Sequence, residues 1–139
     1  MFKAIAVHAN SLGYRPKRDK TAAPSYSFVH PKIRRHILRF TLNRGKPILK
    51  LKYYAAPEYS TFFHEAIRTT IEEYDYRYTG CYGCGKCDET EGYRYRYQDG
   101  REYFRCGTEL IELTDIASLP LTETLNLLEK QHYFFLSKQ

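Results

Sequence analysis

The sequence contains no tryptophan and a single methionine, and its four cysteines all lie between residues 81 and 106. No apolar run approaches the roughly 20 residues that a membrane-spanning helix requires, so we expect no membrane partner. The first residues, MFKAIAVHANSLGYRPKR, offer one lysine and a short apolar patch before polar residues begin, which matches a secretory signal poorly. We therefore expect a cytoplasmic location, where thiols stay reduced.

Motifs that would indicate a particular reaction are also missing. The chain has no P-loop, no GxGxxG stretch and no paired-carboxylate arrangement. His30, His36 and His64 have no serine or cysteine in a recognisable nucleophile motif near them. The sequence thus favours a protein without catalytic activity and leaves an enzyme open as an alternative.

Acidic residues are scarce in the first 60 positions, where 13 Lys and Arg face only Asp19 and Glu58. Residues 61–139 carry 9 basic and 14 acidic side chains, so the net charge of +6 is unevenly distributed. This asymmetry is typical of a polyanion-binding face, or of basic and acidic faces that pair within or between subunits. A solvent-facing sheet surface would also account for the basic residues.

The length of 139 residues predicts one domain spanning 1–139. Apolar residues at helical spacing predict helices over 2–12, 57–76 and 119–135. The basic, Pro-containing stretch over 14–25 predicts a loop. Alternating patterns predict strands at 26–30, 34–42 and 47–55, and a further strand at 108–116. The predicted fold class is α+β, with helices on one face of a mainly antiparallel sheet and a cysteine-rich loop and hairpin.

Two of the predicted strands form a hairpin around Asn43 to Lys46, whose Asn and Gly are typical of a tight connection. The alternation then directs Leu38, Phe40, Leu49 and Leu51 inward. Four cations take the outward positions: Arg35, Arg39, Lys50 and Lys52.

The run GKPILKLKYY, followed by an amphipathic helix, resembles small α+β domains of the YjbR-like and YdhG-like kind. The resemblance covers residues 26–75 and 103–136 and implies the same general fold. Those families have mostly no assigned chemistry, and four cysteines are not part of their pattern, so the resemblance implies no function.

A second hairpin is predicted in YRYRYQDGREYFRC, with Asp99 and Gly100 as a two-residue loop. This register places Tyr93 opposite Cys106 and Arg94 opposite Arg105. One face then carries Tyr93, Tyr95, Phe104 and Cys106. The other carries Arg94, Arg96, Tyr103 and Arg105.

The cysteines Cys81, Cys84 and Cys87 are spaced to wrap one ion, and the hairpin returns Cys106 to them. Four thiolates in a reducing compartment predict a structural Zn²⁺ that orders residues 79–107. A [4Fe–4S] cluster remains open, although no proline follows the fourth cysteine. Disulfides, a redox switch and unliganded thiols also remain open.

Basic side chains interleaved with tyrosine are candidates for contacting phosphates and stacking on bases. The candidates are Arg35, Arg39, Lys50, Lys52, Arg94, Arg96 and Arg105. We therefore expect a zinc-stabilised binding module that contacts nucleic acid, an acidic protein or another polyanion through a basic sheet face. The alternatives are a small-molecule-binding or enzymatic domain with a tyrosine-lined pocket, and an accessory protein that oligomerises through its basic and acidic faces.

Overall fold

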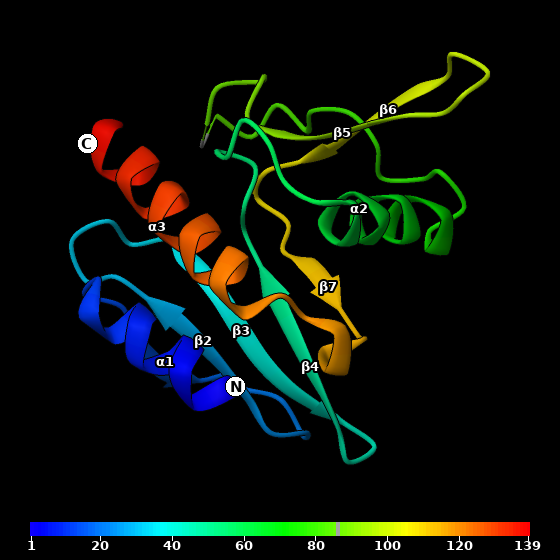
Figure 1. Cartoon of the computed structure of the whole chain (residues 1–139). Coiled ribbons are helices and arrows are strands. Elements are labelled where there is room, and N and C mark those ends of the chain that lie inside the picture. Colours follow the sequence, from blue (N-terminus) through cyan, green and yellow to red (C-terminus); the bar gives the residue numbers. More distant parts are fainter. Residues whose placement is uncertain (86) are drawn as a thin grey trace.

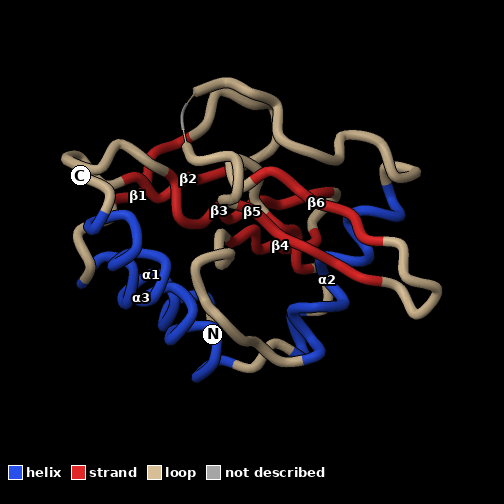
Figure 2. The backbone as a smooth tube through the Cα atoms, turned by 90° about the horizontal axis from the view of Figure 1, so that it is seen from above, coloured by secondary structure: helices blue, strands red, loops and turns tan. Residues whose placement is uncertain are grey.

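A computed structural model describes residues 1–85 and 87–139, so Lys86, between two of the cysteines, lies outside the described residues. Over these described residues the fold is α+β, with a five-stranded antiparallel sheet, a two-stranded sheet and three α-helices (Figures 1 and 2). The large sheet has the order β1 (Arg15–Arg18), β2 (Ser25–Val29), β3 (His36–Asn43), β4 (Lys46–Leu51) and β7 (Ile111–Leu113). The small sheet pairs β5 (Gly92–Arg96) with β6 (Glu102–Cys106).

The predicted hairpin of β3 and β4 is confirmed, with Asn43 paired to Lys46 and Leu38 paired to Leu51. Its two loop residues, Arg44 and Gly45, both have positive φ, as the tight turn that suits twisted strands requires. Because opposite residues share a face, Leu38 and Leu51 enter the core. Arg39 and its partner Lys50 lie on the other face.

The expectation of a loop over residues 14–25 was wrong in part, because β1 occupies residues 15–18 there. All four residues of β1 are exposed, so no alternation of apolar residues reveals the strand in the sequence. Pro16 is tolerated because β1 is the edge of the sheet. Asp19, directly after β1, accepts hydrogen bonds from the hydroxyls of Ser25 and Ser27 and ties the edge to β2.

Helices α1 (Phe2–Ser11) and α3 (Leu121–Ser137) pack together on one face of the large sheet (Figure 1). Their buried residues include Ile5, Ala9, Leu128 and Phe135. The hydroxyl of Tyr14 lies 3.1 Å from Nδ1 of His132, which joins the end of the first helix to the third. A short 3₁₀ helix, η1 (Ile116–Ser118), precedes α3.

Helix α2 (Thr61–Glu73) packs against β7 and the β5–β6 hairpin at the other side of the molecule (Figure 2). Its predicted apolar stripe is confirmed, because Phe63, Ile67 and Ile71 are buried. Tyr93 of β5 is fully buried, and its hydroxyl accepts a hydrogen bond from the backbone N–H of Tyr53. This contact joins the small sheet to the large one.

The predicted register of the β5–β6 hairpin was wrong by one residue. Tyr93 pairs with Arg105, and Cys106 pairs with Gly92. The loop contains three residues, Gln98 to Gly100, because the N–H of Gly100 bonds to the carbonyl of Tyr97 and Gly100 adopts positive φ. A shift of one residue moves every side chain of β6 to the other face. Arg105 therefore lies on the inner face with Tyr93, and Cys106 shares its face with Arg94 and Phe104.

Candidate functional site

Five of the seven predicted basic residues line two neighbouring pockets, which share His36 and Thr108. Arg35 and Lys52 line one pocket, and Arg39, Lys50 and Arg105 line the other. The hairpin places the remaining two elsewhere: Arg94 lies over the ring of Phe104, and Arg96 pairs with Glu102. The structure thus brings the cations of the sheet together and separates them from those of β5.

The first pocket lies where β3 begins and β4 has just ended, and it has a volume of about 200 Å³. We name it the cationic pocket, because no carboxylate is found among the described residues that line it. It is lined by Arg34, Arg35, His36, Lys52, Tyr54, Cys87, Gly107 and Thr108. Such a pocket attracts anions, because its cations are held close together and no described carboxylate lines it.

Lys52 is the most unusual residue of this pocket. The outward position predicted for it implied an exposed side chain, but only 8% of the residue is accessible to solvent. Burial and the neighbouring Arg35 guanidinium lower the pKa of Lys52 to about 8. No described carboxylate lies within ion-pair distance of its ammonium group, which lies 5.9 Å from the centre of the Phe135 ring. The fold therefore holds a poorly compensated ammonium at the pocket.

Arg35 reaches the same pocket, with its guanidinium 5.1 Å from the centre of the Phe135 ring. Its Nη1 lies 3.9 Å from a carboxylate oxygen of Glu91, which is buried. Glu91 also lies 3.7 Å from Nζ of Lys138 and accepts a hydrogen bond from Tyr54. A carboxylate beside the pocket thus orients Arg35.

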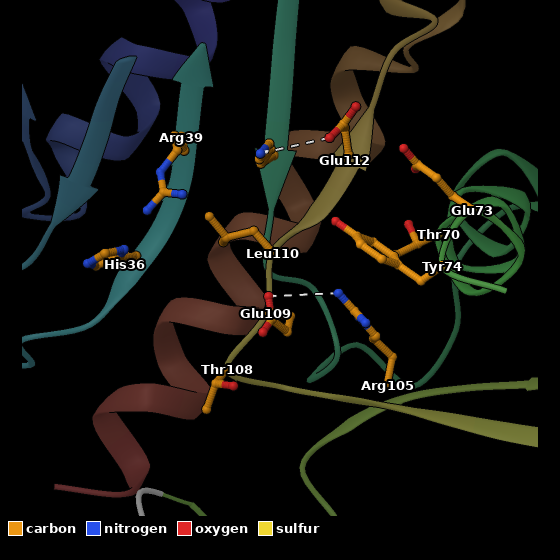
Figure 3. Close-up of a pocket in the computed structure, with 11 residues that line it drawn as sticks. His36, Arg39, Thr70, Glu73, Tyr74, Arg105, Thr108, Glu109, Leu110 and Glu112 are labelled. Carbon is orange, nitrogen blue, oxygen red and sulfur yellow. Dashed lines mark ion pairs between the residues drawn. The ribbon is translucent and has the colours of Figure 1, made fainter. Parts of the chain in front are cut away.

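The second pocket has a volume of about 260 Å³ and is formed by β3, β4, the segment leading into β7, α2 and β6 (Figure 3). We name it the mixed pocket, because both cations and carboxylates line it. Its lining comprises His36, Arg39, Lys50, Thr70, Glu73, Tyr74, Arg105, Thr108, Glu109, Leu110 and Glu112. Two ion pairs cross it, Lys50 with Glu112 at 3.8 Å and Arg105 with Glu109 at 3.8 Å (Figure 3).

Arg105 is 5% exposed, whereas the predicted register, which was wrong by one residue, directed its side chain outward. Its Nη1 donates a hydrogen bond to the carbonyl of Tyr78, and its guanidinium lies 5.0 Å from the centre of the Tyr74 ring. Its buried Nε has no hydrogen-bond partner among the described residues. A buried guanidinium with an unsatisfied N–H is rare in proteins, and a bound ligand is one way to satisfy it.

His36 lies at the junction of the two pockets. Burial and the nearby cations Arg39 and Lys52 lower the pKa of His36 below its usual value. The imidazole is therefore neutral at pH 7, and it adds a polar group without a further charge.

The four cysteines are not gathered into a metal site in this structure. Cys81 and Cys84 are exposed, Cys87 is half-buried, Cys106 is buried, and none forms a disulfide. Within residues 1–85 and 87–139, no three His, Cys, Asp or Glu side chains are arranged to hold a metal ion. Burial, the Glu91 carboxylate, and the thiols of Cys106 and Cys84 raise the pKa of Cys87.

Three exposed tyrosines beside the mixed pocket were not among the predicted site residues. Tyr74, Tyr78 and Tyr82 are 42%, 59% and 46% exposed. The rings of Tyr74 and Tyr78 meet edge to face, and the hydroxyl of Tyr82 donates to the carbonyl of Tyr78. The sequence spacing of four residues was the available signal, but Tyr78 and Tyr82 lie beyond the end of α2. We name these residues the tyrosine cluster.

Comparison of the chain with protein-family models, curated proteins and solved structures gave no match. The resemblance to YjbR-like and YdhG-like domains therefore stays a prediction. No helix among the described residues is long and apolar enough to cross a membrane.

Proposed function

We propose that the protein is a binding module for polyanions and that the cationic pocket is its primary anion site. Arg34, Arg35 and Lys52 supply the charge, and Thr108 supplies a hydroxyl that can donate to an anion oxygen. A phosphate group is the expected occupant, because its charge and several acceptor oxygens match converging guanidinium and ammonium donors.

The burial of Lys52 is the observation that carries this proposal. A lysine is almost never buried without a partner, since its ammonium group loses hydration. An anion in the pocket would provide the opposite charge that the described residues around Lys52 do not. Arg39, Lys50 and Arg105 have acidic partners already, so they support the proposal less strongly.

Polyphosphate is the direct probe, because it carries charge and phosphate oxygens without bases. We expect calorimetric titration at low salt to show binding that weakens steeply as salt rises. Substitution of Lys52 by Gln should weaken binding by about 10-fold or more, because a charge-assisted contact is lost.

Lys46 is the matched control. It is the first residue of β4, the strand that directly precedes Lys52, but it is exposed and lines neither pocket. Lys46→Gln removes the same charge and should weaken binding by less than about threefold. Equal losses from Lys46→Gln and Lys52→Gln would show that binding reflects net charge alone. Absence of binding at low salt would refute the proposal.

We also propose that Cys81, Cys84, Cys87 and Cys106 bind a structural Zn²⁺. Two observations support this. The N–H of Gly83 donates to Sγ of Cys81 over 3.4 Å, the type of contact that stabilises a thiolate. Gly83 and Gly85, which lie between the cysteines, have positive φ, so the chain turns tightly there. Zinc would tie this segment to the end of β6 and thereby border the cationic pocket, which Cys87 lines.

Elemental analysis of protein purified without added metal tests this proposal. We expect about one zinc per chain, in a colourless sample. Cys84→Ser should lower both the zinc content and the melting temperature, because metal-binding energy contributes to folding. Iron with a brown colour would instead identify an iron–sulfur cluster, and unchanged melting of Cys84→Ser would contradict a structural role.

A further inference from the structure

We infer that the polyanion is a single-stranded nucleic acid, whose phosphate occupies the cationic pocket while an unstacked base enters the mixed pocket. This inference rests on the proposed function, and it adds the chemical class of the ligand. It comes from three features beside the cationic pocket: the shared wall of the two pockets, the polar lining of the second and the exposed tyrosine cluster.

The two pockets are adjacent, because His36 and Thr108 line both. A ligand that spans them must therefore present an anionic group to the cationic pocket and an uncharged polar group to the mixed pocket. The mixed pocket is unsuited to a second phosphate, because Glu73, Glu109 and Glu112 line it. A plain chain of phosphates would be attracted by the cationic pocket but not by the mixed pocket, where carboxylates offset the charges of Arg39, Lys50 and Arg105.

A nucleobase fits the mixed pocket chemically, because its edge carries both hydrogen-bond donors and acceptors. Carboxylates accept hydrogen bonds from base amino groups, and arginine donates to base oxygen and ring nitrogen atoms. Arg105 has an Nε–H without a partner among the described residues and is buried at this pocket. Thr70 and Thr108 add hydroxyl groups that can donate or accept.

The tyrosine cluster supplies the apolar surface on which a base stacks. Tyr74 lines the mixed pocket and lies over Arg105, and Tyr78 extends from it into solvent. Large exposed rings beside arginine are the features by which proteins bind unpaired bases. A duplex keeps its bases stacked on each other, so this arrangement favours a single strand.

Fluorescence anisotropy distinguishes the possible ligands through three labelled probes of equal length at low salt. These are a single-stranded DNA of mixed sequence, the same strand without bases, and the corresponding duplex. Each is about 12 nucleotides long, within the site sizes of single-strand binding folds. We expect the single strand to bind about 10-fold more tightly than the abasic strand or the duplex. Unlabelled polyphosphate serves as the competitor that reports on the cationic pocket.

The variant Tyr74→Leu should weaken binding of the base-containing strand by roughly 5- to 150-fold, the range for loss of one stacked base. It should leave binding of the abasic strand unchanged. Tyr133→Leu is the matched control, because Tyr133 is 60% exposed on α3 and lines neither pocket. The Tyr133 variant should bind like the unmodified protein.

The outcomes separate this inference from the proposed function. If the abasic strand and the single strand bind equally, or the duplex binds best, the inference is wrong and the polyanion function stands. If polyphosphate and all three strands fail to bind, the polyanion function is wrong as well. Loss of binding in Tyr133→Leu equal to that in Tyr74→Leu would also overturn the inference.

Discussion

Replacing Lys52 by Met should make the protein more stable while weakening its binding of polyanions. Methionine keeps an unbranched, apolar side chain of similar length and removes only the ammonium group. Burial lowers the pKa of Lys52 from 10.5 to about 8, a change that corresponds to about 3 kcal/mol of unfolding free energy. The variant should therefore gain up to about 3 kcal/mol at pH 7, or roughly 10 °C in melting temperature.

The effect also has a predicted dependence on pH. The folded-state pKa of Lys52 is lower than that of the unfolded chain, so the unfolded state binds more protons between pH 8 and 10.5. The cost of the buried charge is therefore complete below pH 8 and diminishes as pH rises toward 10.5. The stability that Lys52→Met gains over the unmodified protein should decline over the same interval.

Urea unfolding at a series of pH values, in buffer without phosphate or sulfate, measures this difference directly. Lys50→Met is the control, because Lys50 is paired with Glu112 and part-exposed. It should change stability by less than about 1 kcal/mol. The reasoning is refuted if Lys52→Met is less stable than the unmodified protein at pH 7, or if their difference does not vary with pH.

Three further predictions concern the stability of the fold. Tyr93→Phe should cost about 1–3 kcal/mol in urea unfolding, because the buried N–H of Tyr53 loses its acceptor; an unchanged midpoint would contradict this. Gly92→Ala should lower the melting temperature measurably, since its Cβ would lie 2.4 Å from the carbonyl oxygen of Arg105; melting unaltered by the methyl group would show that the hairpin adjusts freely. Burial lowers the pKa of His132 from its usual 6.5. The stability that the neutral imidazole contributes should therefore be complete above pH 6.5 and fall as pH decreases below that value. A His132→Asn variant with the same dependence of stability on pH would exclude His132 as the cause of that dependence.

Much of the fold could be predicted because periodicity reports which residues face the core. The β3–β4 hairpin was predicted with its tight connection at Asn43 to Lys46, and the structure pairs these two residues. The β5–β6 loop contained the similar dipeptide Asp99–Gly100, but Gly100 occupies the third position of a longer turn. Both loops suit such a glycine, so the sequence alone left their lengths open.

The site was harder to predict, because alternation assigns a side of the sheet but not what covers that side. Lys52 and Arg105 were both expected to face solvent. Lys52 is buried because Arg35 and Phe135 approach it from distant parts of the chain. Arg105 is buried through the register of its hairpin and the packing of Tyr74. Such long-range covering has no local signature.

Glu91 links the cationic pocket to the end of the chain. This carboxylate contacts Arg35, Tyr54 and Lys138, the last of these just beyond α3. An anion that enters the pocket must compete with Glu91 for Arg35. Lys138 and Arg35 share this carboxylate, so loss of Lys138 should strengthen the pair between Glu91 and Arg35 and thereby weaken anion binding. Because linkage is reciprocal, a bound anion weakens the contact between Glu91 and Arg35 by the same free energy that this contact costs the anion.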